Sequence, residues 1–509
     1  MSRTRHLLQS SVLVMVLAIL NKVTGLYRVR LSGQVFGTGV EWDAWTAANQ
    51  LPELFFVLIA GGALAAAFIP VYTSYLYSED QKRAKDSANL ANTTLTMVLM
   101  VLTAVCGVAA IFALPITRNV LVPGVSAEQQ LLIASLMRIV LLNTLLFGVS
   151  GVITSLLQAN QHFLLPAAAP IMLDIGYIIG IFVLVPTMGI AGVAWGTVIG
   201  AALHIAIQIP ALIRYRLKIR PKFDFHLAGI HEIVRLMGPR LIMLGAIQAA
   251  DIFWVRIAST LEPGQVSGYS FAWTLQQVPE TLFGTTIALV IFPTMSELFN
   301  KGDIAGLKQT AMQTLRIIWL LTIPSAAGLI LLGRPVIQLF LEGDAFDERS
   351  TAIVFSALVF LSVRVVSEAT IEIVARLFYA RHDTYTPMWG YLLWLVVNVA
   401  AIYAFVGSMG AAGIALASTL AFTVLAVWLY WRNRVELGDL QDRQMLFAFG
   451  RISLATIFMS IAMFFVMNLP LGLFPMLALS AIMGGVVFLA ANWLLGGREL
   501  QDLFQLASR

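Results

Sequence analysis

The chain has 509 residues, of which 59% are hydrophobic and only 12% are charged, and its formal net charge is +5. Soluble domains usually carry roughly 25% charged residues, so the composition excludes an ordinary soluble protein and indicates an integral membrane protein. Its single cysteine, Cys106, excludes a disulfide framework and a thiol-ligated metal site. Cys106 lies in an apolar run, and we expect it to be a packing residue.

Uncharged runs of the sequence are long enough to predict paired membrane spans. A bilayer core about 30 Å thick needs roughly 20 apolar residues per helix, and the run from Ile452 to Gly497 is about twice that length. Asn468, Pro470 and Pro475 supply the turn inside it. The predicted fold is an all-α polytopic membrane protein of about fourteen helices, beginning with a retained first span. Their expected limits are 8–32, 43–77, 84–115, 127–158, 163–186, 189–216, 229–260, 264–299, 304–332, 348–381, 384–407, 410–433, 445–468 and 472–496.

Basic residues concentrate in alternate loops, which predicts the orientation of the chain. Cytoplasmic loops of membrane proteins are rich in Lys and Arg. The intervening loops, such as "PTMG" and "GSMG", carry almost none. We therefore expect a multi-pass protein of the cytoplasmic membrane with both termini in the cytoplasm, and no nucleic-acid partner. The basic loop residues are Arg3, Arg5, Lys82, Arg83, Lys85, Arg214, Arg216, Lys218, Arg220, Lys222, Lys301, Lys308, Arg381, Arg432, Arg434, Arg443, Arg498 and Arg509.

Internal repeats predict two similar halves. "MGIAGVAWGTVIG" from Met188 aligns with "MGAAGIALASTLA" from Met409, and "LLQANQHFLLP" aligns with "LFYARHDTYTP" at the same offset of 221 residues. A shift of six spans keeps every helix direction, so the halves are parallel repeats. We expect two six-helix lobes, residues 1–222 and 223–440, around a central cavity, and two additional helices in residues 441–509. The repeat contains glycines expected to be close-packing positions between helices: Gly189, Gly192 and Gly196.

Ionisable residues inside the expected spans mark candidate sites. A charge at the centre of a bilayer costs at least ~2.5 kcal/mol, so it normally faces a cavity or a partner. Such residues concentrate in the first two helices of each repeat, whereas the helices 84–115, 163–186 and 189–216 hold few or no charges. Lys22 and Arg28 are expected to view one cavity. The residues concerned are Lys22, Arg28, Arg30, Glu53, Arg240, Asp251, Arg256 and Glu280.

Structural interpretations of the same residues stay open. Asp251 and Arg256, five positions apart, can pair with each other. Glu53 and Glu280 each follow a proline and can cap a kinked backbone. A further series in the helix 348–381 repeats every four residues, which favours pairing within that helix over a regulatory or gating role: Arg364, Glu368, Glu372 and Arg376.

Enzymatic motifs are missing from the sequence. The six histidines are scattered, and no HExxH, CxxC or nucleotide-cradling glycine motif occurs. The chain is therefore not expected to be an enzyme or to hold a cofactor. Energy for any transport would come from an ion gradient, with Na⁺ or H⁺ as the coupling ion, from the membrane potential or from the gradient of the substrate.

At "KVTGLYRVRLSGQVFGTGVEWDAWTAANQLPELF" and the later "AAAFIPVY", the sequence resembles the MviN/MurJ family of lipid II flippases. The "MGP" at Met237 and the "FP-x-x-S" at Phe292 add to the resemblance, which spans essentially the whole chain. The superfamily also holds multidrug (MATE) and polysaccharide (Wzx) exporters. The resemblance implies a cavity that opens alternately to each side of the bacterial cytoplasmic membrane. It also implies a lipid-linked oligosaccharide, the undecaprenyl-pyrophosphate-linked peptidoglycan precursor, as substrate, with its tail beside the last two helices.

Site residues follow from the resemblance. Lys22 and Arg28 match cavity cations of the family and would hold the pyrophosphate. Phe56 and Thr274 stand where the family has arginines, and Arg240 or Arg256 would compensate for them. Asp43, Glu53 and Glu280 would meet sugar or peptide donors. Some relatives hold a sodium ion, for which the nearest oxygen ligands are Asp251, Asn398, Ser418 and Thr419.

Other functions remain as alternatives. A cation-coupled multidrug exporter would use Glu53, Asp251 or Glu280 as its proton or sodium site. The cargo could also be another polyprenyl-linked glycan. A membrane enzyme is disfavoured because the outer loops are short. A scaffold that recruits cell-wall synthesis enzymes would leave the buried charges unexplained.

Overall fold

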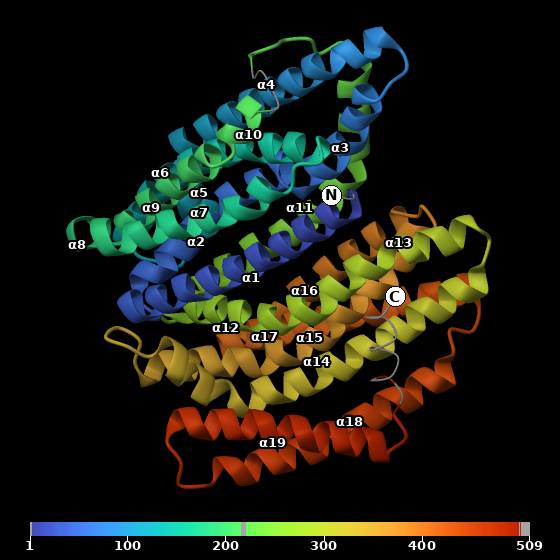
Figure 1. Cartoon of the computed structure of the whole chain (residues 1–509). Helices are drawn as coiled ribbons and strands as arrows, with labels where there is room; N and C mark the ends of the chain where they lie inside the picture. Colours follow the sequence, from blue (N-terminus) through green and yellow to red (C-terminus); the bar gives the residue numbers. More distant parts are fainter. Residues whose placement is uncertain (1–2, 215–219, 498, 500–509) are drawn as a thin grey trace. The chain divides into compact units, whose positions relative to one another are not determined.

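The computed structural model describes residues 3–214, 220–497 and 499, and all regular elements within these ranges are helices (Figure 1). Two compact units divide the chain, residues 1–263 and residues 264–509. Four of the predicted basic residues lie outside the described residues: Arg216, Lys218, Arg498 and Arg509.

The first unit begins with the long helix α1 (Arg3–Phe36). The second predicted span consists of α2 (Val40–Phe55), the π-helical segment η1 (Phe56–Ala60) and α3 (Gly62–Leu76). The unit continues with α4 (Gln81–Ile111), α5 (Ala113–Ile116), η2 (Thr117–Leu121), α6 (Ala127–Ala159), α7 (Leu164–Ile179), η3 (Gly180–Leu184), α8 (Val185–Met188), α9 (Ile190–Ala206), α10 (Ile209–Arg214) and α11 (Ala228–Ala258).

The second unit also begins with a span that contains a π-helical segment, formed by α12 (Gln265–Pro279), η4 (Glu280–Thr285) and α13 (Thr286–Asn300). It continues with α14 (Ile304–Leu341), α15 (Glu348–Ala380), α16 (Tyr385–Met409), α17 (Ala411–Leu437), α18 (Asp442–Met467) and α19 (Leu473–Leu494). In the two composite spans, a proline precedes the π-helical segment: Pro52 for η1 and Pro279 for η4. Proline has no backbone N–H and removes one helical hydrogen bond, which favours a local change of winding.

The lengths and hydropathy of the helices agree with the predicted membrane spans. Within the described ranges, thirteen helices are long and apolar enough to cross a bilayer. Helix α1 is not among these thirteen, although its 34 residues extend over roughly 50 Å; it carries Lys22, Arg28 and Arg30. Helix α14 continues to Leu341, beyond the predicted end at 332. The fold is therefore that of a polytopic all-helical membrane protein.

Backbone conformation repeats at the spacing of the sequence repeat. Gln161 and His382, 221 positions apart, have φ values of 61° and 62°. Gly189 and Gly410, at the same spacing, have φ values of 56° and 57°. Positive φ values are uncommon outside glycine. Their recurrence at this spacing indicates that the backbone around Gln161 and Gly189 follows the same course as the backbone around His382 and Gly410.

Packing of the first unit centres on α3, α4, α6 and α11. Phe68 and Leu90 are fully buried there, together with Ile233 of α11. Helix α11, expected from the sequence to open the second lobe, thus contributes to the core of the first unit. The division into lobes at residue 222 stays a prediction.

Small residues allow two helices of the first unit to approach closely. A Cβ atom added to Gly192 would lie 2.5 Å from the Val185 nitrogen, and one added to Gly196 would lie 2.7 Å from the Gly180 Cα. Both glycines are therefore close-packing positions, as predicted. Gly189 differs, because the nearest heavy atom to its added Cβ is a Glu41 carboxylate oxygen at 3.9 Å. Its positive φ explains the glycine instead.

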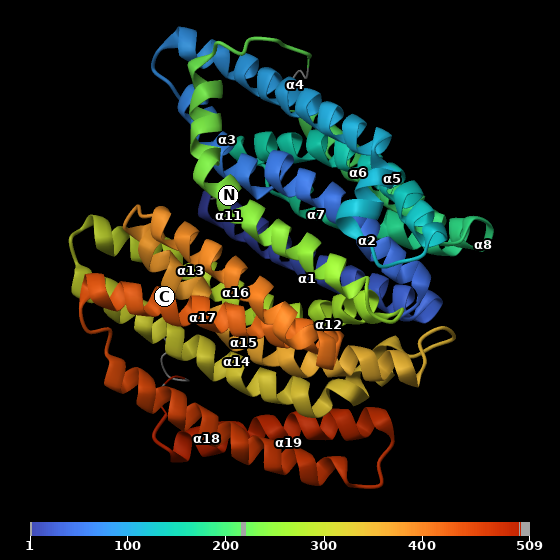
Figure 2. The same cartoon turned by 180° about the vertical axis from the view of Figure 1, so that it is seen from behind.

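Helices α18 and α19 pack on α14 in the second unit (Figures 1 and 2). Leu320 and Leu332 of α14 form a buried cluster with Met459 of α18 and Phe488 of α19. The predicted turn between the last two spans lies between Met467 and Leu473.

Basic segments in both units form hydrogen bonds with distant parts of their own unit. In the first unit, the backbone nitrogens of Arg220 and Lys222 donate to the side chains of Asn92 and Thr96, in the middle of α4. In the second unit, Lys308 Nζ donates to the carbonyls of Leu437 and Asp439, which follow α17. Each of these basic segments is therefore held against a part of its own unit that lies far from it in the sequence.

Candidate functional site

An ion pair joins α1 to α7 in the first unit. Arg28 Nε lies 3.4 Å from Asp174 Oδ1, and Thr24 Oγ1 donates to Asp174 Oδ2 at 2.6 Å. The Asp174 side chain is 5% exposed, whereas that of Arg28 is 33% exposed. The acid is thus enclosed by protein while the guanidinium keeps part of its donor edge open.

Aromatic and hydroxyl groups complete this arrangement. The guanidinium carbon of Arg28 lies 5.1 Å from the centroid of the Tyr177 ring, and Ser32 Oγ donates to the Tyr177 hydroxyl at 3.3 Å. Planar guanidinium groups bind carboxylate and phosphate oxygens through pairs of parallel hydrogen bonds. The α1–α7 cluster (Thr24, Arg28, Ser32, Asp174 and Tyr177) therefore holds an oriented cation that can bind an anion.

Lys22 and Arg30, the other cations of α1, are exposed. Six positions separate Lys22 from Arg28, which places the two residues roughly 120° apart around a helix. They therefore do not share the face of α1 that contacts α7. The expectation that both view one cavity stays a prediction.

Helix α2 places two predicted acids in different surroundings. Asp43 is partly buried in the first turn, where a negative charge suits the helix dipole. Glu53 is exposed and follows Pro52, whose carbonyl accepts a hydrogen bond from Thr144 at 3.3 Å. Phe56, where the resemblance implies an arginine, packs edge-on against Phe147 with ring centroids 5.5 Å apart.

Helix α11 carries three more predicted residues. Arg240 is exposed. Asp251 Oδ1 accepts a hydrogen bond from Trp254 Nε1 at 3.3 Å. Arg256 Nη1 donates to the carbonyls of Asn119 and Val120 at 2.5 and 2.8 Å. Arg256 therefore stabilises the end of η2 rather than pairing with Asp251.

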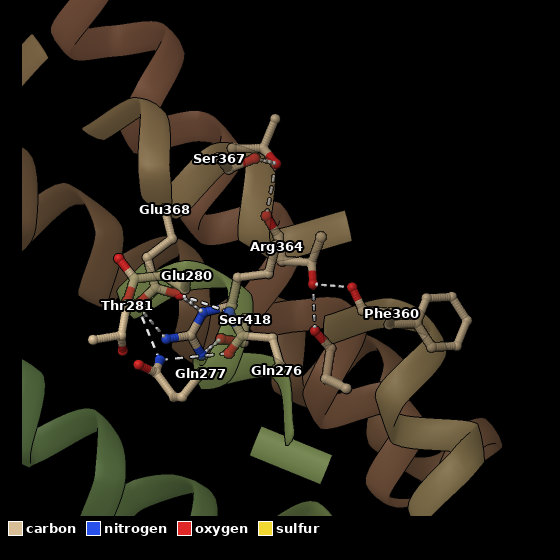
Figure 3. A network of polar contacts seen from close by, with 12 residues as sticks. Gln276, Gln277, Glu280, Thr281, Phe360, Arg364, Ser367, Glu368 and Ser418 are labelled. Carbon is tan, nitrogen blue, oxygen red and sulfur yellow. Dashed lines mark hydrogen bonds and ion pairs between the residues drawn. The ribbon is translucent and has the colours of Figure 1, made fainter. Parts of the chain in front are cut away.

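A polar network lies inside the second unit (Figure 3). Arg364 Nε lies 3.1 Å from Glu368 Oε2, and Arg364 Nη1 donates to Ser418 Oγ at 3.0 Å. Gln276 and Gln277 of α12 also donate to the Glu368 carboxylate, at 3.1 and 3.4 Å. The pairing predicted within this helix is thus confirmed, and Arg376 pairs with Glu372 one turn further on.

Glu280 opens η4 beside this network, and its side chain is buried with 4% of its surface exposed. Its carboxylate accepts hydrogen bonds from Thr285 Oγ1 at 2.9 Å and from Thr281 Oγ1 at 3.4 Å. Glu53, its counterpart in the sequence repeat, is exposed. The two acids thus have different surroundings although the sequence around them is similar.

The implied sodium ligands fit a cation poorly. Ser418 accepts a hydrogen bond from the Arg364 guanidinium, whose positive charge repels a cation at the same oxygen. Thr419 Oγ1 donates to the carbonyls of Phe360 and Ala415. Asn398 is buried on α16. The sodium site stays a prediction.

Sequence reasoning missed Asp174, Gln276 and Gln277. The signal for Asp174 was its position as a lone acid in the apolar run "PAAAPIMLDIGYIIGIF". An isolated acid in a membrane span requires a partner, and here that partner is Arg28. The two glutamines gave no such signal, because uncharged amides are tolerated in many helix environments.

Comparisons with known proteins agree with this architecture. A family model described as "Lipid II flippase MurJ" matches residues 33–483. A probable lipid II flippase MurJ from Vibrio cholerae is 27% identical over 435 residues, covering 84% of this chain and 83% of that protein. The lipid II flippase MurJ of Burkholderia cenocepacia is 26% identical over 410 residues, with 78% of each chain covered.

Solved structures show the same fold. A structure of lipid II flippase MurJ in an inward closed conformation matches with a TM-score of 0.81 and 22% identity, covering 97% of this chain and 100% of that chain. An inward-facing multidrug resistance transporter of the MATE family, in the MOP superfamily, matches with a TM-score of 0.70 and 16% identity, covering 84% of this chain and 99% of that chain.

Proposed function

This chain belongs to the MurJ family of lipid II flippases, and we propose that it carries lipid II across the bacterial cytoplasmic membrane. The family match carries the proposal, because residues 33–483 extend from α1 in the first unit to α19 in the second. The substrate is an undecaprenyl-pyrophosphate-linked peptidoglycan precursor, so its head group is an anion that must leave water to cross the bilayer.

Arg28 is proposed to bind the pyrophosphate of this head group. Its Nε faces Asp174, and a third of its side chain remains exposed to donate hydrogen bonds. Because Tyr177 and Asp174 already orient the guanidinium, less side-chain entropy is lost when an anion binds. Lys22 adds a second exposed cation on α1.

Asp174 is proposed to compensate the charge of Arg28 when no substrate is bound. An unpaired cation in a membrane span is costly, and the ion pair lowers that cost. Pyrophosphate carries more negative charge than one carboxylate and competes for the open edge of the guanidinium. The same ion pair then favours release, because the cation left behind retains a partner.

The orientation of the chain is part of the proposal. We infer that the basic loops of both units face the cytoplasm, since Lys and Arg are enriched in cytoplasmic loops. The polyprenyl tail would contact α18 and α19, whose outer surface carries large apolar side chains such as Phe465 and Trp493. Asp43, Glu53 and Arg240 are proposed as further head-group contacts.

Complementation tests the proposal. Replacing Lys22 and Arg28 together by alanine should abolish rescue of a bacterium depleted of its lipid II flippase, whereas Lys301→Ala should rescue it. Lys301 is a suitable control because it is an exposed cation at the end of α13 that pairs with Glu297. Lipid II reaching the outer leaflet is measured in the same strains. Wild-type rescue by the double variant at normal expression contradicts the proposal.

Cation-coupled multidrug export is the second candidate. It is favoured by the fold shared with the MATE transporter and by the buried carboxyl group of Glu280. A single flippase-depleted strain distinguishes the two functions. A multidrug exporter would raise the drug resistance of this strain but would not restore its growth.

A further inference from the structure

We propose that Glu280 is a proton-binding site of the second unit, a site that takes up and releases one proton per transport cycle. The coupling part of this inference rests on the proposed transport function, whereas the proton site itself rests on the surroundings of the side chain. Burial, the identity of its hydrogen-bond partners and the pairing of nearby charges each support it.

The carboxyl group lies where a neutral acid is more stable than a carboxylate. It is 4% exposed, in a span, and its partners within the described residues are the hydroxyls of Thr281 and Thr285. Burying a charge without a counter-charge is far more costly than burying a hydrogen-bonded neutral group. Hydroxyl partners stabilise both forms through hydrogen bonds, but they supply no positive charge.

Helix α15 packs directly against η4 and carries three cations, of which Arg349 lies in the first turn, about four turns before Arg364. Arg364 is paired with Glu368, and Arg376 is paired with Glu372. The carboxylates of these pairs add negative potential near Glu280, so they disfavour a second unprotonated acid there.

The remaining helices packed against η4 supply no counter-charge either. Helix α12 has no charged residue, and the acid of α13, Glu297, pairs with Lys301 beyond its end. The cations of α14 bond elsewhere: Lys308 with the carbonyls of Leu437 and Asp439, Arg316 with Gln444, and Arg334 with Glu348.

Local backbone structure makes room for the acid. A Cβ atom added to Gly284 would lie 3.0 Å from Glu280 Oε1 and 2.9 Å from Ala369 Cβ, so glycine allows the carboxyl group to fit between η4 and α15. π-Helical segments inside α-helices are rare and occur frequently at functional sites.

Proton exchange then needs no other reactant. The carboxylate takes a proton from hydronium when water reaches it, which forms the O–H bond of the acid and leaves water. It returns the proton to water when it is next exposed. If transport exposes Glu280 to opposite sides of the membrane in turn, each cycle moves one proton.

Infrared difference spectroscopy on the purified full-length protein tests the site directly. At neutral pH, the wild type should show the carbonyl stretch of a buried carboxylic acid, and Glu280→Gln should lack it. Glu53→Gln is the matched control, because Glu53 is the exposed counterpart in the first repeat. A band that persists unchanged in Glu280→Gln overturns the proposal.

Thermal unfolding gives a second readout that does not depend on transport. Glutamine resembles a protonated acid, so Glu280→Gln should unfold close to the wild-type temperature, whereas Glu368→Gln leaves Arg364 without its counter-charge and should unfold earlier. Destabilisation by Glu280→Gln as large as that by Glu368→Gln would contradict the proposal.

Proton movement into vesicles loaded with a pH-sensitive dye tests the coupling role of Glu280 independently of the proton site itself. Wild-type protein supplied with lipid II should move protons, and Glu280→Gln should reduce this movement to that of empty vesicles. If the wild type moves no lipid II while the infrared band is present and lost in Glu280→Gln, the proton site stands and the proposed function fails.

Discussion

Asp174 and Arg28 are partners across two helices that are far apart in the sequence, with Arg28 Nε and Asp174 Oδ1 separated by 3.4 Å. Thr24 anchors the far oxygen of the same carboxylate. The Arg28 guanidinium is therefore held in one orientation, and the Asp174 carboxylate compensates part of its positive charge. This arrangement determines what substitutions should do.

Asp174→Ala should lower the free energy of unfolding by about 1–3 kcal/mol, because it removes the carboxylate that pairs with Arg28 and leaves the Thr24 hydroxyl only the Asn21 carbonyl as acceptor. Asp174→Asn keeps an acceptor for Thr24 and should lose less. Thermal unfolding in detergent measures both.

A binding measurement distinguishes the effect of the Asp174 charge on anion binding from the effect of Asp174 on stability. Asp174→Asn should bind a soluble pyrophosphate analogue more tightly than the wild type, since the carboxylate no longer competes for Arg28. Weaker binding by Asp174→Asn, with unchanged stability, would argue against the competition proposed here.

Arg256→Ala should destabilise the protein by about 1–3 kcal/mol, because Arg256 donates charged hydrogen bonds to the carbonyls of Asn119 and Val120. Arg240→Ala, on the same helix, is the control, because an exposed side chain usually contributes less than about 0.5 kcal/mol. Transport per folded molecule should change little in Arg256→Ala. A loss of transport at unchanged stability would place Arg256 in the substrate site instead.

Gly176→Ala should prevent α7 from packing closely on α9. The added Cβ would lie 2.2 Å from the Cα of Gly200, and backbone atoms cannot move aside as a flexible side chain can. Overpacking of this kind costs about 1–3 kcal/mol or more. Gly107→Ala is the control: no heavy atom lies within 4 Å of its added Cβ, so it should stabilise α4 by about 0.5–1 kcal/mol. Equal unfolding temperatures for the two variants would contradict the packing argument.

Asp347 should make the start of α15 sensitive to acid. The backbone nitrogen and hydroxyl of Ser350 donate to Asp347 Oδ1 at 2.8 and 2.9 Å, and these hydrogen bonds lower the pKa of Asp347. An acid whose pKa is lowered by folding stabilises the fold at pH above its ordinary value of about 3.9, and this contribution is lost as pH falls through the lowered pKa. We therefore expect faster hydrogen exchange in the first turn of α15 on acidification.

Asp347→Asn is the control for this experiment, because asparagine also caps helices but does not titrate. Relative to this variant, the wild type should lose protection only at acidic pH. Asp347→Ala should be less stable locally than Asp347→Asn by about 1 kcal/mol at every pH. An identical pH response in the wild type and Asp347→Asn would exclude Asp347 as the cause.

Sequence periodicity predicted most of the helices, because a membrane span must satisfy its backbone hydrogen bonds internally and present an apolar surface of a set length. The repeat at 221 residues likewise predicted the matching backbone of Gly189 and Gly410. Pairing of Arg364 with Glu368 was predictable too, because residues four apart in a helix are neighbours wherever that helix lies.

Contacts between distant helices could not be predicted in the same way. Nothing in the spacing of α1 indicates that Arg28 meets Asp174, because the rotation of one helix against another depends on the packing of both. The similar sequences around Glu53 and Glu280 likewise gave no sign that one acid is exposed and the other buried. The sequence by itself determined the membrane class, the spans and the repeat, since each follows from local hydrophobicity and hydrogen bonding. Only the tertiary structure decided which charges have partners, since that depends on side chains brought together by folding.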